Sequence, residues 1–124
     1  MKLESEFVSE TVPFSRRESI LKARNIMLED LSKHFVLRVL ARKVGTNEFT
    51  LKKLFKSMFG LSVYTFLRSE RMKKAEQLLK NDAMDQISVA RACGFHSAAG
   101  FVTAFKKYHG ITPGQHRQTV KKNL

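Results

Sequence analysis

Lysine and aromatic side chains recur at helical spacing in residues 48–59, a pattern that can bind nucleic acid. Phe49, Lys53 and Lys56 fall on one side of a helix that advances about 100° per residue, with Lys52 at the edge of that side. A lysine ammonium can donate to O6 and N7 of guanine or pair with a phosphate, and an outward aromatic ring can contact the methyl group of thymine. This face therefore has the chemistry that a helix entering a DNA groove needs.

A second segment, residues 98–109, has a similar length but a plainer outward face. Its outward positions are Ala99, Val102, Thr103 and Lys106. Arginine, asparagine and glutamine, which bind base edges through two hydrogen bonds, are missing from these positions. We therefore expect this segment to hold the DNA backbone through Lys106 and Lys107, with little reading of sequence.

Both segments also carry an apolar stripe opposite the outward face, which predicts a buried side. In the first segment the stripe is Leu51, Leu54, Phe55 and Met58, and in the second it is Phe101, Ala104, Phe105 and Tyr108. We expect Leu51, Phe55, Phe101 and Phe105 to be the core anchors of the two helices.

The two segments belong to an internal repeat. Residues 40–45 (LARKVG) align with 89–94 (VARACG) at an offset of 49, and residues 51–62 align with 101–112 at an offset of 50. Each copy reads as a short helix, a glycine turn and a second helix. This is the helix-turn-helix unit, whose second helix lies in the major groove of DNA.

Helical periodicity covers nearly the whole chain, and the sequence predicts an all-α fold of about seven helices. Ser15 with Glu18 resembles a capping box, and the other expected N-terminal caps are Asn47, Ser62, Asp85, Ser97 and Thr112. The glycines expected to end helices are Gly45, Gly60, Gly94 and Gly110. The predicted organisation is a linker or artificial remnant over 1–14, a first unit over 15–61, a connecting helix over 62–80 and a second unit over 85–120, the domain ending at 124. A connecting helix of this length rises about 28 Å, close to the roughly 34 Å of one DNA turn, so we expect the two units to enter successive major grooves.

Charge supports an anionic partner. The 124 residues carry a formal net charge of +12, and residues 31–124 hold 18 basic against five acidic side chains. The acidic start of the chain is unlike a secretory signal, no apolar run approaches the roughly 18 residues of a membrane span, and one cysteine excludes an intramolecular disulfide framework. These observations favour a basic globular domain of the cytoplasm.

The second copy, GFHSAAGFVTAFKKYHGITPGQHR (94–117), resembles the carboxy-terminal signature of the AraC/XylS family of bacterial transcription regulators. The first copy and the following helix resemble that family's Leu-Ala, Leu-x-x-x-Phe-Lys and Arg-x-x-x-Ala-x-x-Leu-Leu patterns, and the likeness covers roughly residues 18–118. The family often has arginine where Thr103 stands, an aromatic where Gly100 stands and tyrosine where His116 stands, which agrees with weak base reading by the second unit. The resemblance implies a sequence-specific transcription regulator, an activator and not an enzyme.

The resemblance implies double-stranded DNA as the partner, with RNA polymerase as a second one, and an effector ligand only through a domain outside this chain. No cofactor or metal is expected, and the isolated domain should be a monomer or weak dimer. In relatives the positions of Phe49, Lys52 and Lys53 commonly contact DNA. The expected DNA-binding residues are Asn47, Glu48, Phe49, Thr50, Lys52, Lys53 and Lys56 in the first unit, Ser97, Ala98, Ala99, Val102, Thr103, Lys106 and Lys107 in the second, and Arg68 on the connecting helix.

Several alternatives remain open at this point. Cys93 and His96, with His109 and His116 downstream, superficially match zinc-ligand spacing, but the repeat aligns Cys93, His109 and His116 with positions expected to pack in the core. A basic membrane-surface protein or a protein-interaction module is a different class of answer. Within the family, the chain could be the carboxy-terminal piece of a larger regulator or a complete small one.

Overall fold

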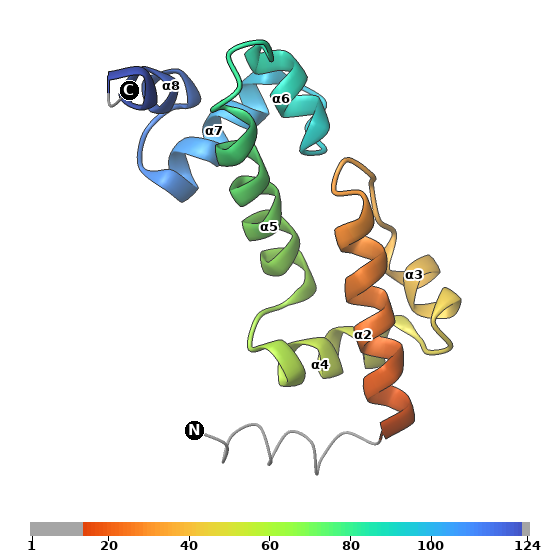
Figure 1. Ribbon diagram of the computed structural model, residues 1–124. Coiled ribbons are helices and arrows are strands. Elements are labelled where there is room, and N and C mark those ends of the chain that lie inside the picture. Colours follow the sequence, from red (N-terminus) through yellow and green to blue (C-terminus); the bar gives the residue numbers. More distant parts are fainter. Residues whose placement is uncertain (1–13, 123–124) are drawn as a thin grey trace. The chain divides into compact units, whose positions relative to one another are not determined.

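Helices are the only regular secondary structure over residues 14–122, the part of the chain that the computed structural model describes (Figure 1). This confirms the predicted all-α class, with seven helices and no strand among the described residues. The expected linker over 1–14 lies outside the described residues except for Phe14, which is helical. The helices are α2 (Phe14–Glu29), α3 (Leu37–Lys43), α4 (Glu48–Phe59), α5 (Val63–Leu78), α6 (Gln86–Ala92), α7 (Ala98–His109) and α8 (Pro113–Lys122).

Side-chain caps begin most of these helices where the sequence predicts them. The Thr50 amide donates to Asn47 Oδ1 at 2.8 Å, which fixes the start of α4. At the start of α8, Thr112 Oγ1 accepts from the Gln115 amide, and Gln115 Oε1 accepts from the Thr112 amide. This reciprocal pair is a capping box, and it satisfies two backbone donors that the first turn would otherwise leave unpaired. The caps expected at Ser62, Asp85 and Ser97 are likewise present.

Two sequence expectations about helix ends are wrong. Ser15 does not cap α2, because Phe14 before it already has helical backbone and the Ser15 carbonyl accepts the Ser19 hydroxyl at 3.3 Å within the helix. The connecting helix α5 ends at Leu78 rather than near Lys80. Its 16 residues therefore rise about 24 Å, less than the expected 28 Å.

The glycine turns are as predicted. Gly45, Gly60, Gly94 and Gly110 all have a positive φ, between 76° and 85°. The requirement for glycine is strictest at position 94, because a Cβ added to Gly94 would also lie 2.8 Å from the carbonyl oxygen of Leu31. An L side chain at this position would meet both backbone strain and a steric clash.

The first compact unit comprises α2, α3, α4 and the first turn of α5. Its core gathers one face from each helix, and the buried residues are Ile20, Ala23, Met27, Leu40, Ala41, Val44, Leu51, Phe55 and Val63. Phe55 has no exposed surface, and its ring centroid lies 4.6 Å from that of Phe59 and 5.2 Å from that of Phe66. The ring of Phe55 thus anchors α4, as the sequence predicts.

The second unit comprises residues 31–34 and the chain from Leu67 onward. Its core cluster is Met72, Ala75, Leu79, Val89, Ala90, Cys93, Phe101, Ala104 and Phe105. Tyr108, expected in this stripe, is instead 44% exposed. His109 takes the inner position, with its ring 4.2 Å from that of Phe105 and its Nε2 3.1 Å from the Met72 carbonyl oxygen. An imidazole can pack against an aromatic ring and at the same time form a hydrogen bond to a backbone carbonyl oxygen. The spacing of apolar residues alone does not predict this choice of His109 over Tyr108.

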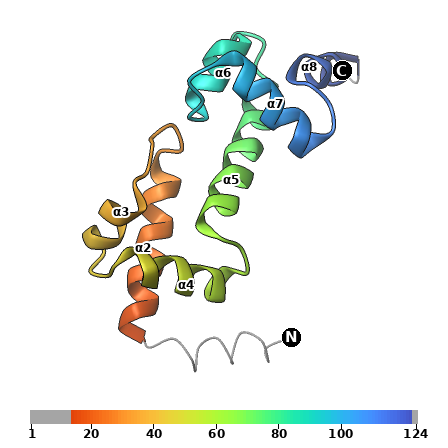
Figure 2. The same ribbon diagram turned by 180° about the vertical axis from the view of Figure 1, so that it is seen from behind.

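The repeat is visible in the backbone of each unit. Helices α3 and α6 have seven residues each, and α4 and α7 have twelve. In both copies the turn between the two helices makes the same hydrogen bonds, Thr46 to Ala41 at 2.8 Å and Phe95 to Ala90 at 2.9 Å. Helix α6 contacts α7 as α3 contacts α4. Figure 2 shows the same helices from behind. The predicted duplication of the helix-turn-helix is therefore confirmed in the structure.

Candidate nucleic-acid interface

Helix α4 turns its basic and aromatic side chains away from the core of the first unit. Leu51 and Phe55 are fully buried, whereas Lys53 is exposed and Phe49 keeps 74% of its surface exposed. Lys52 and Lys56 are also exposed. A phenylalanine with this exposure contributes little to the core of the first unit.

Two pairs of side chains one helical turn apart organise this face. Glu48 Oε2 accepts an ion pair from Lys52 Nζ at 3.0 Å. Lys53 Nζ lies 5.9 Å from the centre of the Phe49 ring, within the range of a cation–π contact. Glu48 also stands in the first turn of α4, where a negative charge is favoured by the helix dipole. The lysines therefore present their charge from defined positions on the helix surface.

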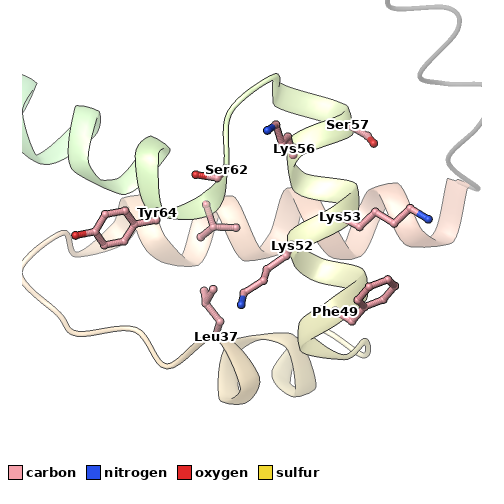
Figure 3. A pocket seen from close by; sticks show the side chains of 9 residues that line it. Leu37, Phe49, Lys52, Lys53, Lys56, Ser57, Ser62 and Tyr64 are labelled. Atoms are coloured by element: carbon pink, nitrogen blue, oxygen red, sulfur yellow. The ribbon is translucent and has the colours of Figure 1, made fainter.

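An apolar groove of about 650 Å³ runs beside these lysines, within the first unit (Figure 3). Its lining residues are Leu37, Phe49, Lys52, Lys53, Lys56, Ser57, Ser62, Val63 and Tyr64. Tyr64 is 67% exposed in the first turn of α5. The sequence interpretation missed this wall of the groove. The sequence predicts Ser62 as the cap of the next helix, and Tyr64 is the second residue of that helix. An aromatic residue directly after a predicted cap was therefore the signal from which this wall of the groove could have been found.

Helix α7 offers a smaller outward face in the second unit. The exposed positions are Ser97, Ala98, Ala99, Gly100, Thr103, Lys106 and Lys107, and Val102 is half-buried. The Gly100 amide donates to Ser97 Oγ at 3.0 Å, and a Cβ on Gly100 would lie at the same 3.0 Å from that oxygen. Glycine at this helical position therefore relieves crowding against the cap, which is a local packing reason for its presence.

The basic residues of α5 divide into different roles. Arg71 Nε and Nη2 donate to the carbonyl oxygens of Leu31 and Lys33 at 3.0 and 2.7 Å. Lys74 Nζ donates to the Ala92 carbonyl at 3.1 Å and so caps the end of α6. These two cations therefore stabilise the second unit through hydrogen bonds to backbone carbonyl oxygens. Arg68 is half-buried and engaged within the protein, and its contact with the DNA backbone stays a prediction.

The residues that superficially matched a zinc pattern lie in different environments. Cys93 is fully buried in the second core, and burial raises the pKa of its thiol to about 11. His109 packs on Phe105, and His116 Nε2 lies 3.4 Å from Glu76 Oε2. Among the described residues no three His, Cys, Asp or Glu side chains come together as metal ligands. The positions that the repeat aligned with core residues are packing positions here.

Comparisons with known proteins agree with this geometry. The model of the family described as "Helix-turn-helix domain" matches residues 40–119. The transcriptional activator AggR of Escherichia coli is 32% identical over 113 residues, covering 91% of this chain and 40% of the relative. The chain thus spans about two fifths of that relative's length. Among the described residues, none of the helices has the length and apolar character required to cross a membrane.

Solved structures share the fold. The C-terminal domain of the two-component response regulator yesN from Fusobacterium nucleatum has a TM-score of 0.74 at 34% identity, covering 81% of this chain and 98% of that chain. The DNA-binding domain of AdpA, solved in complex with a target DNA, has a TM-score of 0.79 at 24% identity, covering 85% of this chain and 95% of that chain. The second likeness speaks for the fold alone.

Proposed function

The chain belongs to the AraC-type family of helix-turn-helix domains, and from that membership we propose that it is the sequence-specific DNA-binding part of a bacterial transcription activator. It acts on double-stranded DNA in the cytoplasm. Helix α4 of the first unit and helix α7 of the second each enter a major groove as recognition helices. The single observation that carries the proposal is the outward face of α4, where three exposed lysines and an exposed phenylalanine stand opposite a fully buried core stripe.

In the first unit, α4 reads base edges. Lys53 donates to O6 and N7 of a guanine, and Phe49 contacts the methyl group of a neighbouring thymine. Lys52 and Lys56 hold the flanking phosphates, and Asn47, Glu48 and Thr50 stand at the end of the helix that approaches the DNA. The ammonium of Lys53 lies 5.9 Å from the centre of the Phe49 ring, so the two side chains stand together on this face of α4.

In the second unit, α7 mainly positions the protein. Lys106 and Lys107 are exposed and bind phosphates, which adds affinity without reading sequence. Ala99, Val102 and Thr103 are small enough to let α7 approach the groove closely, and Ser97 and Ala98 line its start. Arg68 adds a contact to the DNA backbone. An activator also contacts RNA polymerase, which is the second partner of this proposal.

The experiment that tests the proposal is selection of bound sites from random double-stranded DNA by the whole chain, followed by measurement of affinity at several salt concentrations. The expected result is an enriched motif whose best-defined half lies under the first unit. Failure to enrich any motif, with equal affinity for all duplexes, would contradict sequence-specific binding. Binding to anionic vesicles in preference to DNA would instead favour the membrane-surface alternative.

A further inference from the structure

We propose that the acidic segment of residues 1–13 docks onto the basic groove of the first unit and competes there with DNA. The inference rests on the proposed function, since the lysines of this groove are the ones assigned to DNA. It goes beyond that function because it assigns a second occupant to the same surface, from within the chain. The occupant is identified by its charge, its apolar residues and its point of attachment.

The groove and the segment are complementary in charge. Lys52, Lys53 and Lys56 surround the groove and Glu48 opposes one of them, which leaves a local charge of +2. Residues 1–13 contain Lys2 against Glu4, Glu6 and Glu10, which gives −2. A segment of this charge can replace two phosphates at the lysines and thereby neutralise the surface.

The groove and the segment are also complementary in polarity. The groove is lined by apolar parts of Leu37, Phe49, Val63 and Tyr64, and its volume of about 650 Å³ is in the range of pockets that enclose small ligands. Besides its carboxylates the segment carries the apolar residues Leu3, Phe7, Val8 and Val12. Phosphate groups cannot cover an apolar groove, whereas an acidic apolar peptide covers both the groove and its lysines.

The segment is attached to the protein next to the first turn of α4. Ser15 and Arg16, at the start of α2, line a small cavity together with Asn47 and Thr50 of the first turn of α4. Phe7 is seven residues before Phe14, so an extended chain carries it at most about 25 Å from that point. The nine residues from Asn47 to Lys56 rise about 14 Å. The whole outer face of α4 is therefore within reach, and the short tether gives the segment an effective concentration on the order of millimolar.

Docking is measured without DNA, on the full chain. A nitroxide is attached to Ser5→Cys, because buried Cys93 does not compete for the label. The expected result is paramagnetic broadening of the amide signals of Lys52, Lys53 and Tyr64, and its loss when Leu3, Phe7 and Val8 are changed to Ser. Broadening confined to the first turns of α2 and α4, next to the attachment point, would overturn the proposal.

Competition is measured by DNA affinity. Glu4→Gln, Glu6→Gln and Glu10→Gln together should raise affinity about tenfold if nine molecules in ten are closed. The matched control is Glu18→Gln, Glu29→Gln and Asp82→Asn, three exposed acids outside the segment, which should raise affinity much less for the same change in net charge. The Ser variants, with unchanged charge, should raise it like the Gln variants.

The outcomes separate this inference from the function on which it rests. Broadening at Lys52, Lys53 and Tyr64, together with no DNA binding by any variant, would refute the proposed function and leave the docking of the segment intact. Broadening at the same three residues, with equal DNA affinity in wild type, segment variants and control, would refute competition between the segment and DNA. Equal gains in the segment variants and the control would show general repulsion of DNA, and would also refute it.

Discussion

Replacing Lys53 by alanine should relax base preference in one half of the DNA site, whereas replacing Lys106 by alanine should lower the affinity for all DNA sequences alike. Both lysines are exposed on the outward faces of α4 and α7, and Lys106 aligns with Lys56, three residues after Lys53. Lys53 has an aromatic neighbour that supports its ammonium, with Nζ 5.9 Å from the Phe49 ring centre. Lys106 stands among alanine, valine and threonine side chains that cannot bind base edges through hydrogen-bond pairs.

The magnitude follows from the type of contact. A lysine that reads guanine contributes about 1–3 kcal/mol of discrimination, so Lys53→Ala should lower affinity for the preferred site about 5- to 150-fold. Lys52→Ala should lower DNA affinity less, because Lys52 has to give up its 3.0 Å ion pair with Glu48 in order to bind DNA. An exposed ion pair of this kind contributes about 0.2–1 kcal/mol. Lys106→Ala removes one phosphate contact and should lower the salt slope by about one.

The assay is a matrix of wild type, Lys53→Ala, Lys52→Ala and Lys106→Ala against single-base variants in each half of the site, at fixed salt. The expected pattern is a loss of discrimination for Lys53→Ala in one half only, with a uniform drop for Lys106→Ala. The reasoning is refuted if Lys53→Ala leaves base preference unchanged while the half-site under the second unit proves the more sensitive to sequence. Circular dichroism of each variant checks that the helices are retained.

Three further outcomes follow from the core and the charge. Phe55→Ala and Phe105→Ala, both fully buried, should each lower the free energy of unfolding by about 3–5 kcal/mol, whereas exposed Tyr108→Ala should cost under about 1 kcal/mol; denaturant unfolding measures all three, and small losses for both phenylalanines would contradict the repeat register. DNA affinity should fall roughly 10³–10⁵-fold between about 50 and 200 mM salt if about 6–10 phosphates are contacted, and a flat dependence would contradict binding along the backbone. Cys93, whose thiol pKa is raised to about 11 by burial, should resist a thiol reagent in the native state, and stability should fall as pH rises from about 9 to 11 because the unfolded chain ionises first; rapid native labelling would contradict its place in the core.

The helix limits were predictable because local chemistry decides them. A side-chain oxygen at Asn47, Asp85 or Ser97 accepts the amide three residues on, and this depends on few other parts of the protein. Ser15 matched the same pattern and is not a cap, since the pattern does not exclude helical residues before it. Within the repeat such ambiguity is smaller, because the helix limits have to agree with the pattern of both copies.

The parts that sequence could not predict depend on contacts between distant residues. The sequence does not indicate that the guanidinium of Arg71 donates to the carbonyl oxygens of Leu31 and Lys33, or that the ammonium of Lys74 donates to that of Ala92. The exchange of Tyr108 for His109 in the core depends on a carbonyl 37 residues away, that of Met72. The groove beside α4 needs Leu37 and Tyr64 from two other helices, so no single helical wheel contains it.

The two copies of the helix-turn-helix combine one scaffold with different outward residues. Turn hydrogen bonds, caps and central phenylalanines recur in both copies, and the phenylalanines lie on the buried side of α4 and α7. At an offset of 50 the outward residues differ, with Phe49 facing Ala99 in the alignment and Lys53 facing Thr103. Since the outward residues are exposed, changing them leaves the core contacts intact. The same buried chemistry therefore constrains the fold of both copies, while the outward face of each copy is free to differ. The unequal division of DNA reading that we propose for the two units rests on that freedom.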